Sequence, residues 1–170
     1  MSQIQACLAQ LFAKQSLSIA QSYDFFTEVA AGNVDPIELS AALVALKLKG
    51  ETAQEIAGAA QAFRAVATNL PGHFSQAIDC CGTGGDGSNT INVSTTAAIV
   101  AGACGLQVAK HGNRSVSSKS GSADLLEQLG VNIQMTPEIA AATLEKAKVN
   151  FLFAPIYHPG IRHAMGVRQK

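Results

Sequence analysis

Residues 82–90 combine the features that let main-chain amides hold a phosphate. The segment reads Gly-Thr-Gly-Gly-Asp-Gly-Ser-Asn-Thr, and it lies between a short apolar run and a helical pattern. Glycines let backbone N–H groups approach a ligand, and the N-terminus of the following helix adds partial positive charge. A glycine-rich turn without a ligand is the alternative. The strand–loop–helix order favours a phosphate site.

The kind of phosphate ligand follows from the residues around these glycines. Gly82, Gly84 and Gly87 satisfy the G-x-G-x-x-G pattern of dinucleotide-binding loops. Such a site needs an acidic residue about 20 positions later, where this chain has Lys110. A Walker loop is excluded because no Gly-Lys-Ser/Thr follows. Asp86 would repel a pyrophosphate unless a metal ion intervened, so the residues favour a phosphorylated ligand bound with a metal.

Two further polar segments fit the same site. Asn92-Val93-Ser94-Thr95 stands at the start of a predicted helix, where side chains either cap the helix or contact a ligand. Lys110-His111-Gly112-Asn113-Arg114 ends a predicted strand, and a serine-rich stretch follows it. The carboxyl ends of parallel strands line the ligand crevice of an open sheet. We therefore expect these segments to meet the glycine loop.

The elements that must position these residues change in kind near residue 70. Before it, apolar spacing and caps such as Ser18, Asp35 and Thr52 predict four amphipathic helices. After it, strands and helices alternate with short connections, which is typical of parallel βαβ units. Two domains are predicted, a small helical one over 1–70 and an α/β one over 73–170. The expected strands cover 77–81, 106–109, 131–134 and 150–154, and the expected helices cover 94–104, 122–129, 136–148 and 159–170.

Composition limits the classes of protein to which the chain can belong. Apolar residues make up 48% and charged residues 14%, with a net charge of zero. This excludes a disordered polar tail and a generally basic nucleic-acid binder. No transmembrane run or signal peptide is recognisable, so a cytoplasmic location is expected. Residues 87–123 and 146–170 contain bases but no acid, which points to a local anion site. The four cysteines are expected to be buried, reduced thiols.

Taken together, residues 82–86, 92–95 and 110–114 resemble three signatures of the anthranilate phosphoribosyltransferase family, in order and at family-like spacing. His158-Pro159 and Val167-Arg168 resemble the segment on its anthranilate side. The resemblance implies a small helical domain plus the first part of a larger α/β domain with a parallel sheet, as in nucleoside phosphorylases and phosphoribosyltransferases. It also implies transfer of the phosphoribosyl group from 5-phosphoribosyl 1-diphosphate (PRPP) to anthranilate, with release of diphosphate, in tryptophan biosynthesis.

Site residues follow from this resemblance position by position. Anthranilate-contacting positions are matched by Gly82, Asn113 and Arg168, and Ser94 matches a magnesium ligand, so Mg²⁺ is the implied cofactor. No general acid or base is nominated, because the amine of anthranilate is already a neutral nucleophile. The positions that match PRPP contacts are Gly82, Gly85, Asp86, Thr90, Asn92, Val93, Ser94, Thr95, Lys110, His111, Gly112, Asn113, Arg114, Ser115, Val116, Ser117, Ser118 and Ser122.

The chain departs from the family in length. Family members are about twice as long, and their second half carries an adjacent Asp-Glu pair that binds magnesium, whereas no such dipeptide occurs here. We therefore expect an N-terminal fragment with little or no activity of its own. The family's homodimer, joined through the helical domain, is the implied assembly, with no nucleic-acid or membrane partner. A pyrimidine nucleoside phosphorylase-like enzyme and a nucleic-acid-binding paralogue are the alternatives. The Lys-His-Gly-Asn-Arg segment disfavours the phosphorylase-like enzyme. The zero net charge disfavours the nucleic-acid-binding paralogue.

Overall fold

The computed structural model describes residues 2–82, 91–115 and 120–168. They form two compact units, one of Met1–Ala67 with His158–Lys170 and one of Thr68–Tyr157, each considered by itself below. Within the described ranges, no helix combines the length and apolar character needed to cross a membrane.

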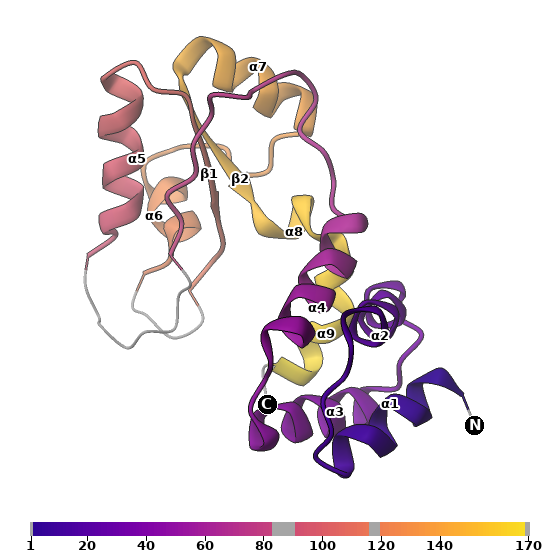
Figure 1. Ribbon diagram of the computed structural model, residues 1–170. Coiled ribbons are helices and arrows are strands. Elements are labelled where there is room, and N and C mark those ends of the chain that lie inside the picture. Colours follow the sequence, from indigo (N-terminus) through magenta and orange to yellow (C-terminus); the bar gives the residue numbers. More distant parts are fainter. Residues whose placement is uncertain (1, 83–90, 116–119, 169–170) are drawn as a thin grey trace. The chain divides into compact units, whose positions relative to one another are not determined.

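The first unit is all helical (Figure 1). Its N-terminal helices begin where the sequence predicts, because Ser18, Asp35 and Thr52 each accept a hydrogen bond from a first-turn N–H. Gly32 ends the second helix with a φ of 81°. The four predicted helices are thereby confirmed. The unit contains α1 (Gln3–Phe12), α2 (Ile19–Ala31), α3 (Pro36–Lys49), α4 (Ala53–Ala65), η1 (Pro159–Ile161) and α9 (Arg162–Arg168).

The last helix packs on the helical unit rather than on the sheet. Ala164 of α9 is 7% exposed and belongs to the same core as Phe25, Leu11 and Leu39. The expected domains, 1–70 and 73–170, stay predictions; by contacts within the structure, the compact units separate after Tyr157. The physical reason is that burial against α2 and α3 covers the apolar side of α9.

A carboxylate inside the helical unit joins three of its segments. Glu55 is 2% exposed, and its carboxylate accepts hydrogen bonds from the Leu17 N–H at 2.9 Å, the Thr52 N–H at 2.8 Å and Lys49 Nζ at 2.9 Å. The predicted capping box of Thr52 and Glu55 is present. Burial raises the pKa of Glu55, but the bonds from Lys49, Thr52 and Leu17 outweigh burial and lower it.

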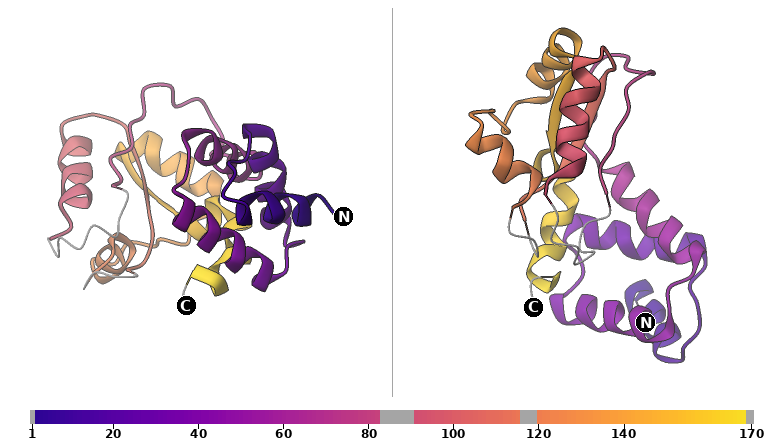
Figure 2. Two further views of the ribbon diagram at one scale, coloured as in Figure 1. Left: turned by 60° about the horizontal axis from the view of Figure 1, so that its bottom comes forward. Right: turned by 90° about the vertical axis from the view of Figure 1, so that its left-hand side faces the viewer.

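The second unit carries the predicted parallel sheet. Strands β1 (Val108–Gly112) and β2 (Val149–Phe153) pair in parallel with Val108 opposite Val149, and Ile78 joins Val108 by one parallel bridge. Helix α5 (Val93–Ala103) packs on β1 and α7 (Pro137–Ala147) on β2 (Figures 1 and 2). The remaining helices are α6 (Ser122–Gln128) and α8 (Ala154–Tyr157).

Three of the expected strands differ from the structure. The strand expected over 77–81 is reduced to the bridge at Ile78. The stretch 131–134 is not a strand, because the Asn132 side chain accepts a bond from the Gln134 N–H and turns the chain. Strand β1 starts later than expected because Gly105 still closes the last turn of α5 through its bond to Gly102. Lys110, His111 and Gly112 therefore lie within β1.

The cysteines differ from expectation in burial. All four are free thiols, but Cys81 and Cys104 are exposed and Cys80 is half-buried. Only Cys7 is buried, so the prediction of buried thiols is wrong for the exposed pair.

Candidate functional site

The predicted segments 92–95 and 110–114 come together at the carboxyl ends of the strands. Cys80 Sγ donates to the Ser94 carbonyl at 3.2 Å, which places the end of the first strand segment beside the start of α5. Ser122 Oγ at the start of α6 donates to the Asn113 carbonyl at 3.3 Å, just beyond β1. Asn92 Nδ2 lies 3.5 Å from the Gly121 carbonyl. These contacts bring the starts of α5 and α6 and the end of β1 to one edge of the sheet, beside the strand segment that leads to Gly82.

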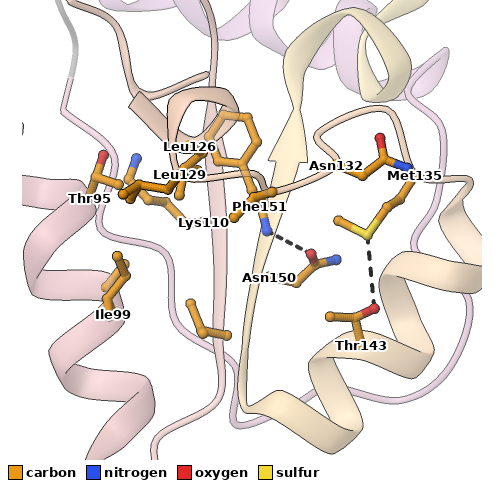
Figure 3. A pocket seen from close by; sticks show the side chains of 13 residues that line it. Thr95, Ile99, Lys110, Leu126, Leu129, Asn132, Met135, Thr143, Asn150 and Phe151 are labelled. Carbon is orange, nitrogen blue, oxygen red and sulfur yellow. Dashed lines mark hydrogen bonds between the residues drawn. The ribbon is translucent and has the colours of Figure 1, made fainter. Parts of the chain in front are cut away.

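Lys110 is the buried cation of this edge. Its side chain is on β1, the residue is 4% exposed, and Nζ donates to the His111 carbonyl at 3.0 Å. Across the described residues, no carboxylate lies within ion-pair distance of Nζ. Figure 3 shows the amine and the Thr95 hydroxyl at the same end of a cavity. A buried charge is costly without a partner, so an anion here would be strongly favoured.

The first turn of α5 presents its main-chain donors without a side-chain cap. Asn92 precedes the helix, yet its side chain makes no cap hydrogen bond and instead reaches Ser120 Oγ at 3.4 Å and the Gly121 carbonyl. Thr95 is 2% exposed and Ser94 half-buried. Of the two uses expected for Asn92–Thr95, a cap by the Asn92 side chain is not found, and the positive end of the helix dipole would favour an anion at this position.

Arg114, one of the positions expected to contact PRPP, pairs with two carboxylates in the structure. Its guanidinium pairs through two nitrogens with Glu127, lies 3.4 Å from Asp124 Oδ1, and stands 5.7 Å from the centre of the Phe153 ring. The Glu127 carboxylate raises the pKa of Arg114. The positive charge of Arg114 is thus largely neutralised by Asp124 and Glu127. Lys110 is the cation of β1 that has no carboxylate partner among the described residues.

The cavity beside Lys110 has a volume of 310 Å³ (Figure 3). Apart from Thr95 and Lys110 at one end, its walls are mainly apolar, including Ile99, Leu126 and Val149. Such walls suit hydrocarbon rather than a diphosphate. The polar strand ends therefore suit a phosphate better than this cavity does.

Several expected contact residues are not placed by the structure. Gly85, Asp86, Thr90, Val116, Ser117 and Ser118 lie outside the described residues. Arg168 ends α9 in the helical unit, and its side chain is likewise outside. In the described ranges, no group of three or more His, Cys, Asp or Glu side chains is arranged to hold a metal ion. The Ser94 hydroxyl is the expected magnesium ligand that the structure does place.

Asp79 is a site residue that the sequence analysis missed. One of its carboxylate oxygens, Oδ1, accepts from the Cys81 N–H at 3.0 Å and from the His111 N–H at 3.2 Å. The side chain thus takes the place of a strand partner just after the Ile78 bridge, while the main chain is free to diverge toward Gly82. Aspartate is common at turns, so Asp79, two residues before the chain must turn, could have indicated this role from the sequence.

Two glycines of the site provide a matched pair of substitutions. A Cβ on Gly112 would lie 2.3 Å from Ser122 Oγ and 2.5 Å from Phe151 Cε2, whereas one on Gly82 meets no described atom within 4 Å. We expect Gly112→Ala to lower the free energy of unfolding by about 1–3 kcal/mol, as overpacking does. Gly82→Ala should leave stability unchanged and, under the function proposed below, weaken PRPP binding. Thermal denaturation and calorimetry measure the two effects, and equal Tm losses in both variants would contradict this assignment.

Comparison with protein families also divides the chain into a helical part and an α/β part, the second of which includes η1 and α9. Residues 5–67 match the model described as the glycosyl transferase family, helical bundle domain. Residues 74–170 match the model described as the glycosyl transferase family, a/b domain.

Individual relatives bear one name. The chain is 62% identical over 165 residues to an anthranilate phosphoribosyltransferase of Pseudoalteromonas translucida, covering 97% of this chain and 46% of the relative. A solved Thermus thermophilus anthranilate phosphoribosyltransferase is 43% identical with a TM-score of 0.88, over 95% of this chain and 49% of that one. The Saccharomyces cerevisiae enzyme in complex with PRPP and Mg is 30% identical with a TM-score of 0.88, over 98% and 50%. The chain thus spans about half the length of these relatives, and it belongs to the glycosyl transferase family that combines a helical bundle domain with an a/b domain.

Proposed function

We propose that this chain forms the N-terminal half of an anthranilate phosphoribosyltransferase and binds PRPP with Mg²⁺. The observation that carries the proposal is the buried Lys110 ammonium, which has no carboxylate partner among the described residues and stands beside the uncapped start of α5. The relatives bear this name, one yeast structure contains PRPP and Mg, and another contains 4-fluoroanthranilate.

The residues of this edge suit the departure of diphosphate. As the bond from the anomeric carbon to the diphosphate oxygen breaks and the bond to the anthranilate nitrogen forms, negative charge grows on the leaving group. Lys110 and the N–H groups of the first turn of α5 would stabilise that charge. The amine proton leaves to solvent, since the neutral amine needs no strong base. Ser94 would help hold Mg²⁺, which neutralises diphosphate charge when bound.

The remaining contacts extend this proposal. Gly82, Asn113 and Arg168 would contact anthranilate, with the Arg168 guanidinium suited to its carboxylate. The helical unit would join two copies in a cytoplasmic homodimer. Exposed apolar side chains at Ile37, Val44 and Leu48, which recur on one face of α3, support such an interface.

Loss of anthranilate fluorescence with PRPP and Mg²⁺ tests the function. The 170-residue chain should show negligible turnover, because the Asp-Glu pair expected from the family is not in it. A chimera that continues after Lys170 with the remainder of the Pseudoalteromonas translucida relative should turn over only with both additions. A folded chimera that is inactive, or full turnover by the chain alone, would refute the proposal.

A further inference from the structure

The cavity beside Lys110 lies within the second unit and is lined by residues of α5, both strands, α6, α7 and the segment between α6 and α7 (Figure 3). Its volume of 310 Å³ falls in the range of small-molecule pockets, which is about 300–1,000 Å³. Such pockets combine mainly apolar walls with a few polar groups that orient the ligand. This cavity has both features.

The buried cation lies at one end of the cavity. Figure 3 shows the Lys110 amine and the Thr95 hydroxyl there, and the two residues are 4% and 2% exposed. The ammonium donates to the His111 carbonyl at 3.0 Å and has further N–H groups to donate. Within the described chain, no carboxylate reaches them. This end of the cavity therefore suits one negatively charged group.

The walls away from Lys110 are mainly hydrocarbon. They include the aliphatic side chains of Ile99, Leu126, Leu129, Val131 and Val149. The exposed fractions of Ile99, Leu129 and Val131 are 43%, 63% and 38%, so the chain covers these residues only in part. A ligand with a hydrocarbon body would gain free energy by covering this apolar surface.

Two polar side chains of the other walls already have partners in the chain. Asn150 Nδ2 donates to the Ala140 carbonyl at 2.9 Å, and Asn150 Oδ1 accepts from the Phe151 N–H at 2.8 Å. Thr143 Oγ1 donates to the Ile139 carbonyl at 2.8 Å. These bonds leave the ammonium end as the more favourable place for the polar part of a ligand.

We propose that this cavity is a second ligand site, which binds a small apolar monocarboxylate. The carboxylate would accept hydrogen bonds from Lys110 Nζ and the Thr95 hydroxyl. The hydrocarbon would lie against Ile99, Leu126 and Val149. A phosphate ester is disfavoured, because it carries up to about two negative charges against one buried ammonium. The site goes beyond the proposed function, and one consequence rests on that function: PRPP and the carboxylate would use the same ammonium and exclude each other.

Calorimetric titration of the 170-residue chain with octanoate tests the site, with octan-1-ol as an uncharged ligand of the same chain length. Wild type should bind octanoate saturably and at least about tenfold more tightly than octan-1-ol, as expected for a hydrogen bond to a charged group. Lys110→Met should remove this preference by weakening octanoate binding while octan-1-ol binding stays the same or strengthens. In ¹⁵N NMR spectra of wild type, amides of Ile99, Leu126 and Val149 should shift with octanoate.

A matched pair of alanine substitutions on α5 tests the cavity itself. Ala98 lines the cavity and is 1% exposed, whereas Ala97 is exposed. Ala98→Leu should fill part of the space and weaken binding of both octanoate and octan-1-ol by at least about tenfold. Ala97→Leu adds the same side chain outside the cavity and should bind both ligands like wild type. Circular dichroism checks that both variants are folded, and the NMR shifts of wild type depend on neither.

The results separate this site from the function proposed above. Absence of saturable octanoate binding by folded wild type, or shifts confined to residues outside the cavity, would overturn the proposal. Equal octanoate affinity in wild type and Lys110→Met would also overturn it, since the carboxylate would then lie elsewhere. If octanoate binds as expected but PRPP does not bind, the ligand site stands and the proposed function fails. If both bind and neither displaces the other, mutual exclusion is wrong.

Discussion

Replacing Lys110 with methionine is expected to weaken PRPP binding by about 10- to 150-fold, the equivalent of about 1.5–3 kcal/mol for a hydrogen bond to a charged group. The ammonium is buried and, within the described part of the chain, bonded only to the His111 carbonyl. Methionine keeps the length of the side chain and removes its charge. Stability should stay the same or rise, because the variant no longer buries an uncompensated cation.

Lys146→Met is the matched control for this experiment. Lys146 is an exposed residue of α7 in the same unit, so its replacement removes one positive charge without touching the strand ends. Calorimetry with PRPP and Mg²⁺ should give near wild-type affinity for Lys146→Met. Equal weakening in both variants would mean that Lys110 acts only through the overall charge, and loss of stability in Lys110→Met would show that the ammonium has an anionic partner in the folded chain.

Replacing Glu55 with alanine is expected to lower the free energy of unfolding of the helical unit by about 3–5 kcal/mol, the usual cost of breaking a buried ion pair. The substitution leaves the Lys49 side chain buried, at 7% exposure, without its carboxylate partner. It also removes the acceptor of the Leu17 and Thr52 amides. Chemical denaturation followed by circular dichroism measures the loss. Glu51→Ala, an exposed glutamate nearby in the chain, is the control and should change stability little.

The same carboxylate gives the helical unit a pH dependence of known sign. The pKa of Glu55 is lowered in the fold, so its contribution to stability is present above the ordinary glutamate value of about 4.3 and is lost as pH falls through the folded value. Glu55→Gln removes this contribution. The difference in unfolding free energy between wild type and Glu55→Gln should therefore shrink below about pH 4. A difference that is constant from neutral to acid pH would contradict the assignment.

Local signals in the sequence predicted the helical unit well because each helix carries its own start and end. Ser18 and Thr52 cap their helices with neighbouring N–H groups, and Gly32 supplies the left-handed residue that ends α2. These are contacts between residues three or four positions apart, so a short window of sequence contains them. The docking of α9 on this unit depends on burial of Ala164 against distant helices, and no local pattern encodes it.

The sequence predicts which segments make up the candidate site, but it does not indicate which acidic residues hydrogen-bond to them. The Asp79 carboxylate binds an amide 32 positions away, and Asp124 binds one nine positions back. Arg114 was expected from the family resemblance to contact PRPP, and no sequence pattern indicated that Asp124 and Glu127 reach it from α6. Such ion pairs cannot be recognised from separation along the sequence, because only the fold brings the start of α6 close to the end of β1.

A titration of the ¹⁵N-labelled chain with PRPP and Mg²⁺, followed by NMR, tests most directly whether the carboxyl ends of the strands bind PRPP. Amides at Gly82, Ser94, Lys110 and Asn113 should shift together in a saturable manner, whereas amides of α1 and α3 should stay in place. The same titration of Lys110→Met should require much higher PRPP concentrations. No shifts at the strand ends in a folded wild-type chain, or shifts confined to the helical unit, would contradict the proposed site.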